Sequence, residues 1–150
     1  MKNILVPVDF SEHSNYAVEV AVDLAKKNGA TILLLHCVEL PRRFVTESTS
    51  ALPEELFFMR EAGLNVKKLS EELKEKGLTV KTVVETTALT YAVKNLLESE
   101  SVDFIVMGST GATGSKELFL GSNAEKIVRT SSVPVLVIKD KTDISKVKKL

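Results

Sequence analysis

The feature that constrains the fold most strongly is a regular alternation of short apolar runs with longer amphipathic stretches. The apolar runs are rich in Val, Ile and Leu, and most of them are apolar at successive positions, as in strands that are buried on both faces. We predict strands over residues 3–8, 31–38, 78–85, 102–107 and 133–138. Strands that alternate with amphipathic helices predict an α/β fold, an open, doubly wound parallel sheet with helices on both faces.

The stretches between these runs carry helix signals. The first helix is expected to end at Asn28-Gly29, since glycine accepts the left-handed conformation of a C-cap. Pro53 opens a long second helix, and Thr86 or Thr87 is expected to cap the third. The spacing of apolar residues in the second helix predicts an inward stripe made of Leu56, Met59, Ala62, Val66, Leu69 and Leu73. Phe57 and Phe58 lie off this stripe.

Composition narrows the class of protein. Lys plus Arg and Asp plus Glu are both 20 in a chain of 150 residues, so no net charge favours nucleic acid or an acidic membrane. A single cysteine, Cys37, excludes a disulfide framework, and no apolar run reaches the length of a membrane span. We therefore expect a cytoplasmic protein with one domain over residues 1–140. Residues 141–150 form a basic tail, and residues 145–150 within it resemble the start of the first strand at residues 2–5, which raises the hypothesis of a junction to a second, similar domain.

The most informative stretch for function runs from residue 102 to residue 129. A strand is followed by glycines at positions 108, 111 and 114, and Gly121-Ser122 then opens a helix. This order offers backbone N–H groups to an anion such as phosphate. The spacing fits neither a P-loop nor the dinucleotide fingerprint. Gly108 and Gly111 would allow the main chain to approach a ligand closely and to take a positive φ, although glycines also serve plain turns. Ser122 followed by Glu125 is also a capping box, a pattern that is compatible with phosphate binding.

These residues form the motif Gly-x-x-Gly-x9-Gly-Ser, and three further segments accompany it: Ile4–Ser11, Leu34–Val38 and Ser132–Ile138. Together they resemble the universal stress protein family, in particular its ATP-binding branch, over residues 1–140. The resemblance implies a five-stranded parallel sheet of order 3-2-1-4-5. In that order the chain reverses direction between strands 1 and 4, where ligands of open sheets bind.

The resemblance also implies roles for individual residues. The adenosine end would be lined by Pro7, Val8 and Asp9, and the Asp9 carboxylate would accept from the ribose hydroxyls; the alternative for Asp9 is an acid that stabilises the helix start. Cys37 stands where the family has a small apolar residue against adenine, and Met107 would touch the base. The phosphates would be cradled by Gly108, Thr110, Gly111, Gly121, Ser122 and Asn123.

The implied function is a regulatory module that binds ATP, with Mg²⁺ arriving on the triphosphate, and forms a homodimer through its last strand. One alternative is a slow ATPase that positions water near Ser122, but no general base is evident in the sequence. Another is an interaction module that binds no nucleotide and uses Phe57 and Phe58 as an anchor. We assign no catalytic residues; His36 is interpreted as a hydrogen-bonded core or edge histidine, and His13 as a surface residue.

Overall fold

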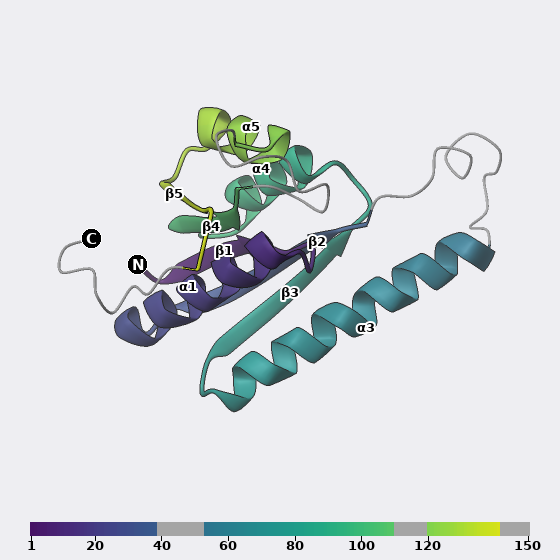
Figure 1. The fold of residues 1–150 in the computed structure, drawn as a ribbon, viewed down its shortest axis with the longest axis horizontal. Coiled ribbons are helices and arrows are strands. Elements are labelled where there is room, and N and C mark those ends of the chain that lie inside the picture. The colour runs from purple at the N-terminus through teal and green to yellow at the C-terminus, as the bar shows by residue number, and fades with distance from the viewer. Residues whose placement is uncertain (39–52, 110–119, 142–150) are drawn as a thin grey trace.

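The computed structural model describes residues 1–38, 53–109 and 120–141. These residues form one sheet and the helices that cover it (Figure 1). The strands are β1 (Asn3–Pro7), β2 (Thr31–Cys37), β3 (Thr79–Glu85), β4 (Phe104–Gly108) and β5 (Val135–Ile138). The helices are α1 (Glu12–Asn28), α3 (Pro53–Glu75), α4 (Leu89–Ser99) and α5 (Ser122–Thr130). The observed bounds differ from the predicted ones by at most two residues.

The sheet has five parallel strands in the order β3-β2-β1-β4-β5, which confirms the predicted fold. From β1 the chain builds outward through β2 to β3, and then crosses to the other side of β1 to form β4 and β5. The carboxyl ends of β1 and β4 are therefore neighbours at the point where the direction of winding reverses, which is the position at which open α/β sheets bind ligands.

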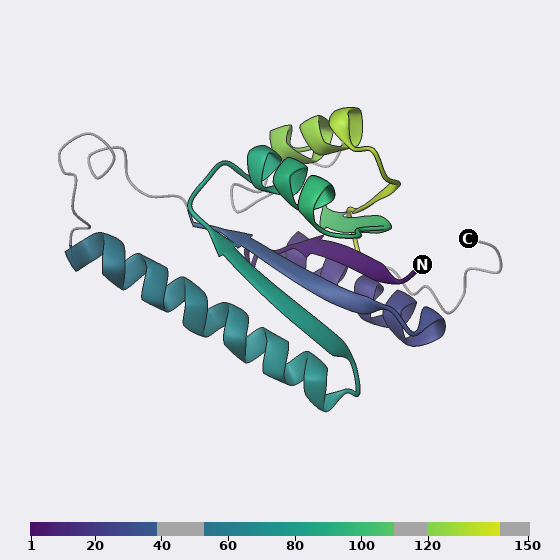
Figure 2. The same ribbon diagram turned by 180° about the vertical axis from the view of Figure 1, so that it is seen from behind.

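Helices cover both faces of the sheet, as predicted. Figures 1 and 2 show α1 and α3 on one face and α4 and α5 on the other. The two hydrophobic clusters follow this division, because successive residues of a strand point to opposite faces. On β2, Ile32 and Leu34 pack in the α1 cluster, whereas Leu33 and Leu35 pack in the cluster with α4 and α5.

Helix α1 begins and ends as the sequence predicts. The hydroxyl of Ser11 accepts a hydrogen bond from the backbone N–H of Ser14 at 3.3 Å. Gly29 has φ 64° and forms the left-handed C-cap. Two other predictions about helices are wrong. The N-cap of α4 is Ala88, which makes no side-chain hydrogen bond, in place of Thr86 or Thr87. Leu56, predicted to lie in the inward stripe of α3, is 58% exposed, and the buried side chains of this helix begin at Ala62.

The carboxylate of Asp103 joins the amino ends of β1 and β4. Asp103 Oδ2 accepts hydrogen bonds from the backbone N–H groups of Lys2 and Asn3, each at 2.9 Å. The Asn3 side-chain amide donates in turn to the carbonyl of Ser101 at 2.6 Å. The two N–H bonds from Lys2 and Asn3 lower the pKa of the Asp103 carboxyl, because they stabilise its charged form. They fix β1 beside the start of β4, and this register sets where the carboxyl ends of the two strands meet.

Among the residues that the structure describes, no helix is both long enough and apolar enough to cross a bilayer.

Candidate functional site

The predicted site residues within the described ranges come from four segments at the carboxyl edge of the sheet: the turn after β1, the end of β2, the end of β4 and the start of α5. Ile4 pairs with Phe104 and Leu5 with Ile105, so β1 and β4 run side by side toward this edge. Thr110 and Gly111 lie outside the described residues.

The turn after β1 presents Asp9 at the surface. Val8 is buried, and its N–H donates to the carbonyl of Leu35 on β2 at 2.8 Å. The N–H of Asp9 donates to Ser14 Oγ at 3.1 Å, and its Oδ1 accepts from the N–H of Ser11 at 2.9 Å. The Asp9 side chain is therefore oriented by the start of α1, yet it stays exposed and keeps acceptor capacity for a ligand.

Gly108, at the end of β4, is needed for packing within the protein. A Cβ at this position would lie 2.8 Å from the carbonyl carbon of His13 and 2.9 Å from the backbone nitrogen of Ser14. The close approach that the structure shows is therefore to the first turn of α1, and the predicted approach to a ligand stays a prediction. The prediction that Gly108 adopts a positive φ is wrong, since Gly29 and Gly77 are the glycines with positive φ among the described residues.

The start of α5 is held against the end of β4 by the backbone of Ser109. The Ser109 carbonyl accepts from the N–H of Gly121 at 2.6 Å, and its own N–H donates to the carbonyl of Ile138 on β5 at 2.9 Å. Ser109 is 3% exposed, whereas Ser122 and Asn123 are exposed in the first turn of α5. The positive end of the α5 dipole therefore lies beside the carboxyl end of β4, where it favours an anion.

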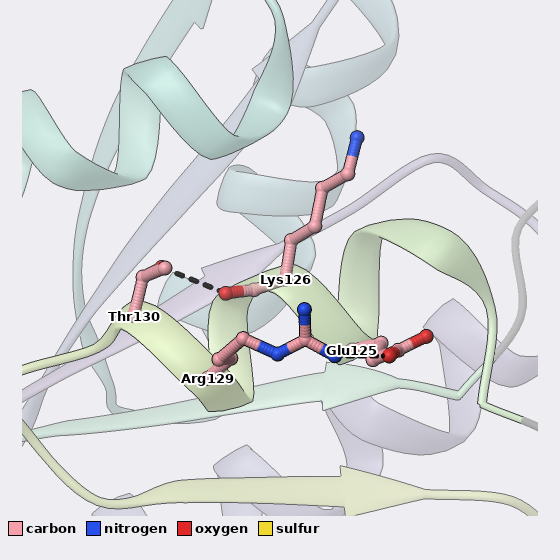
Figure 3. A network of polar contacts seen from close by, with 4 residues as sticks. All are labelled: Glu125, Lys126, Arg129 and Thr130. Atoms are coloured by element: carbon pink, nitrogen blue, oxygen red, sulfur yellow. Dashed lines mark hydrogen bonds and ion pairs between the residues drawn. The ribbon is translucent and has the colours of Figure 1, made fainter.

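The predicted capping box of α5 is not formed. The N-cap residue is Gly121, no side chain caps the helix, and Ser122 is already its first helical residue. Figure 3 shows that Glu125 turns toward Arg129, with which it forms an ion pair one helical turn later. The Glu125 side chain is thus engaged by Arg129, and the hydroxyl of Ser122 is not used as a cap.

The apolar residues predicted for the adenosine end lie beneath this edge. Pro7, Val8 and Met107 are buried, and Cys37 is half-buried at the end of β2. Met107 and Cys37 belong to the cluster on the α4 and α5 face. Val8 instead packs in the α1 cluster on the other face. Cys37 and Met107 can form an apolar floor for a planar group, whereas Asp9 and the start of α5 supply the polar contacts.

The arrangement provides binding chemistry. In the described ranges, no group of three or more His, Cys, Asp or Glu side chains could hold a metal ion. His36 is half-buried and its Nδ1 bonds to the carbonyl of Val8 at 2.7 Å, which confirms the prediction of a hydrogen-bonded histidine. The predicted site residues within the described ranges supply one carboxylate, the backbone N–H groups of a helix start and apolar side chains, which together can hold a ligand.

Sequence reasoning missed two residues that shape the site. Ser14 accepts the N–H of Asp9 through its side chain, and Ser109 joins β4, β5 and α5 through its backbone. Ser109 directly follows a predicted site glycine, which was an available signal. The Ser14 contact had none, because it depends on the path of the turn between β1 and α1.

A groove of about 490 Å³ lies elsewhere, between α4 and α5. Its lining includes Val93, Leu97 and Ile127, and none of the predicted site residues. It is therefore distinct from the candidate site.

Comparison with known proteins places the chain in a family. The family model of the universal stress protein family matches residues 1–139. Universal stress protein MJ0577 of Methanocaldococcus jannaschii is 30% identical, over 93% of this chain and 96% of that protein. The solved structure of MJ0577 superposes with a TM-score of 0.76 and covers 95% of this chain and 98% of that chain.

Two more distant structures share the fold and were solved with nucleotides. A universal stress protein from Archaeoglobus fulgidus in complex with dAMP is 16% identical, with a TM-score of 0.66 over 93% of this chain and 98% of that chain. A universal stress protein in complex with cAMP is 22% identical, with a TM-score of 0.61 over 91% of this chain and 96% of that chain. From the family match and the identity to MJ0577, this chain belongs to the universal stress protein family.

Proposed function

We propose that this protein binds an adenine nucleotide, ATP together with Mg²⁺, at the carboxyl edge of β1 and β4, and works as a regulatory module in a stress response. The observation that carries the proposal is the juxtaposition of an exposed acceptor, Asp9, with the start of α5, which Ser109 holds beside the end of β4. Relatives of the same fold in complex with dAMP and cAMP support the choice of an adenine nucleotide.

In this proposal each segment contacts one part of the nucleotide. Asp9 accepts hydrogen bonds from the ribose hydroxyls, since its carboxylate is exposed. Pro7 and Val8 line the adenosine end, and Cys37 and Met107 provide apolar contact for adenine. The phosphates are cradled by Gly108, Thr110, Gly111, Gly121, Ser122 and Asn123, with the backbone N–H groups of Ser122 and Asn123 as donors at the start of α5, since the N–H of Gly121 bonds to Ser109. The phosphate oxygens supply most of the ligands of Mg²⁺, which fits the lack of a metal-binding cluster among the described residues.

The first test is to identify what the protein carries through purification. The purified protein is denatured, and the released small molecules are identified by mass spectrometry. We expect an adenine nucleotide. If none is released, titration of the protein with ATP and Mg²⁺ in a calorimeter decides, and the absence of heat at millimolar nucleotide would refute the proposal.

A substitution at Gly111 tests the proposed contact between the backbone and the phosphates. Gly111→Val should abolish nucleotide binding if the backbone there approaches phosphate closely. Gly63→Val is the matched control, because a Cβ at Gly63 meets nothing within 4 Å and the residue lies on α3. Unchanged affinity of the Gly111→Val protein would contradict the proposed phosphate contact.

Hydrolysis is a separate question. A slow ATPase would release phosphate over hours from a protein that binds ATP, whereas a pure binding module would not. We expect binding with negligible turnover, because no general base is identified in the sequence or in the described residues of the site.

We further propose a homodimer that forms through β5. This strand pairs with β4 alone among the described strands, and Val135, Leu136 and Val137 are only half-buried. An edge strand of this kind can pair with a second copy. The carbonyl of Pro134 accepts from the N–H of Ile105, and the carbonyl of Ile138 accepts from the N–H of Ser109. Successive residues of a strand direct their backbone groups to alternate sides, so the N–H and carbonyl of Val137 point away from β4. Val137→Pro should therefore yield a monomer by sedimentation; a dimer that persists would refute this interface.

One observation favours a second candidate function, an interaction module. Leu56, Phe57 and Leu64 of α3 are each more than half exposed. Phe57→Ser should weaken binding to a protein partner while leaving nucleotide affinity unchanged. If the protein binds no adenine nucleotide at all, this candidate becomes the leading one.

A further inference from the structure

The turn that carries Asp9 is fastened to β2 by the residue that precedes Asp9. The N–H of Val8 donates to the carbonyl of Leu35 at 2.8 Å, and the carbonyl of Val8 accepts from His36 Nδ1 at 2.7 Å. Because a carbonyl can only accept, His36 carries a proton on Nδ1. A side chain of β2 therefore fixes the peptide that joins Val8 to Asp9.

The residue after Asp9 is held in an unfavourable conformation. Phe10 has φ 63°, and it is the only non-glycine residue with a positive φ within the described ranges. Bulky residues rarely adopt this region, and where they do the surrounding structure must enforce it. The ring of Phe10 lies edge-on to the ring of His36, with the centroids 5.2 Å apart and an angle of 63° between the planes.

His36 thus contacts the residues on both sides of Asp9, through a hydrogen bond to Val8 and a ring contact to Phe10. On the other side of the turn, Ser14 Oγ and the N–H of Ser11 bind the backbone and the carboxylate of Asp9. A strained turn that is fixed from both sides beside an exposed acceptor is typical of a group that is oriented before its ligand arrives.

We propose that His36 is a positioning residue for the nucleotide. Through Val8 and Phe10 it holds the turn in the left-handed conformation that presents the Asp9 carboxylate to the two ribose hydroxyls. The inference rests on the proposed function, because it takes the ligand to be an adenine nucleotide bound at Asp9. In this proposal His36 does not contact the nucleotide. It acts through the orientation of Asp9 and so affects only the contacts to the ribose.

The test compares two variants with two ligands. His36→Leu removes the donor but keeps an apolar side chain, whereas His36→Asn retains an N–H close to the position of Nδ1. The ligands are ATP and 2′,3′-dideoxy-ATP, which lacks both ribose hydroxyls, each with Mg²⁺. Calorimetry gives the Kd, and urea unfolding gives the stability of each variant.

We expect His36→Leu to weaken ATP binding about three- to ten-fold, the range for one hydrogen bond. Binding of the dideoxy nucleotide should change less than two-fold, because the oriented carboxylate has no hydroxyl to meet. His36→Asn should recover part of the lost ATP affinity, because its amide N–H can replace the bond to Val8 but not the ring contact with Phe10. A role in stability alone would instead lower the free energy of unfolding and leave the ratio of the two affinities unchanged.

The outcomes separate this inference from the function on which it rests. If the original protein binds neither ligand, the proposed function fails and the inference fails with it. If the original protein binds ATP but His36→Leu weakens both ligands equally, or weakens neither, the positioning role alone is refuted. If His36→Leu does not fold, Phe10→Gly is the second variant, since it removes the ring contact while permitting the same φ. We expect it to weaken the binding of ATP more than that of the dideoxy nucleotide.

Discussion

The two edges of the sheet each carry an aspartate next to a strand, and the two residues are used differently. At the amino edge, Asp103 accepts two backbone N–H groups from residues about a hundred positions away in the sequence. At the carboxyl edge, Asp9 accepts one N–H from Ser11, two residues further on, and remains exposed. Both carboxylates are exposed, but the first joins distant parts of the chain, whereas the second is oriented locally.

The bonds of Asp103 indicate a structural role, whereas those of Asp9 are compatible with ligand binding. Long-range bonds at Asp103 fix the register of β1 against β4, so its removal should affect folding. The bonds at Asp9 lie within the turn that precedes α1 and the start of that helix, so its removal should affect the site more than the fold. Four experiments can break or sharpen this division.

The largest effect is expected at Gly108, where the carboxyl edge itself has a structural role. Gly108→Ala places a Cβ 2.8–2.9 Å from backbone atoms of His13 and Ser14, so α1 or β4 must move. We expect the free energy of unfolding to fall by about 1–3 kcal/mol, measured by urea denaturation. Gly63→Ala, in open space on α3, is the control and should raise it by about 1 kcal/mol. Equal effects of the two changes would show that this edge does not depend on the close packing.

Asp9→Ala should weaken nucleotide binding about ten-fold or more, since a charged acceptor for hydroxyl groups is lost. Its urea midpoint should change little, because the bonds of the Asp9 carboxylate are local and exposed. Calorimetry and denaturation on the same sample measure both quantities. A protein that loses stability but keeps its affinity would reverse the proposed roles of the two aspartates.

Asp103→Asn should give the opposite result. The side chain keeps its shape but loses the charge that strengthens its bonds to Lys2 and Asn3. We expect a lower urea midpoint, by less than in Gly108→Ala, with nucleotide affinity within about two-fold of the original. A loss of affinity at unchanged stability would mean that the amino edge influences the site directly.

The smallest effect is the pH dependence at the amino edge. Because the folded state lowers the pKa of the Asp103 carboxyl, its contribution to stability is present above the unfolded pKa, near 4. It is lost as the pH falls through the lower, folded value. The difference in urea midpoint between the original protein and Asp103→Asn should therefore be constant from pH 7 to about 5 and shrink below about pH 4. A difference that grows on acidification would contradict this assignment.

Most of the architecture could be predicted from the sequence, because hydrophobic periodicity reports burial directly. Runs such as 31–38 and 102–107 are apolar on both faces, and they form β2 and β4 in the interior of the sheet. The order of the strands did not follow from periodicity, since pairing depends on contacts that are distant in sequence. It came from the family resemblance.

The details that failed are those in which tertiary contacts override local patterns. Ser122 and Glu125 have the spacing of a capping box, but Arg129 one turn later engages the glutamate. Leu56 follows the apolar period of α3, yet the buried stripe of this helix begins six residues further on, at Ala62. Gly108 was predicted to allow a close approach to a ligand, whereas the close approach that the structure shows is to the backbone of α1, which no local pattern specifies.

The two backbone bonds of Ser109 have a consequence for how the chain is made. They join β4 to Gly121 and to Ile138 of the last strand, whereas Asp9 lies near the beginning. During synthesis on the ribosome, Asp9 and β1 emerge first, and more than a hundred further residues must leave the exit tunnel before Ile138 can meet Ser109. A nascent chain that stops short of Ile138 leaves the N–H of Ser109 without this acceptor. The candidate site is therefore completed only after β5 has been synthesised.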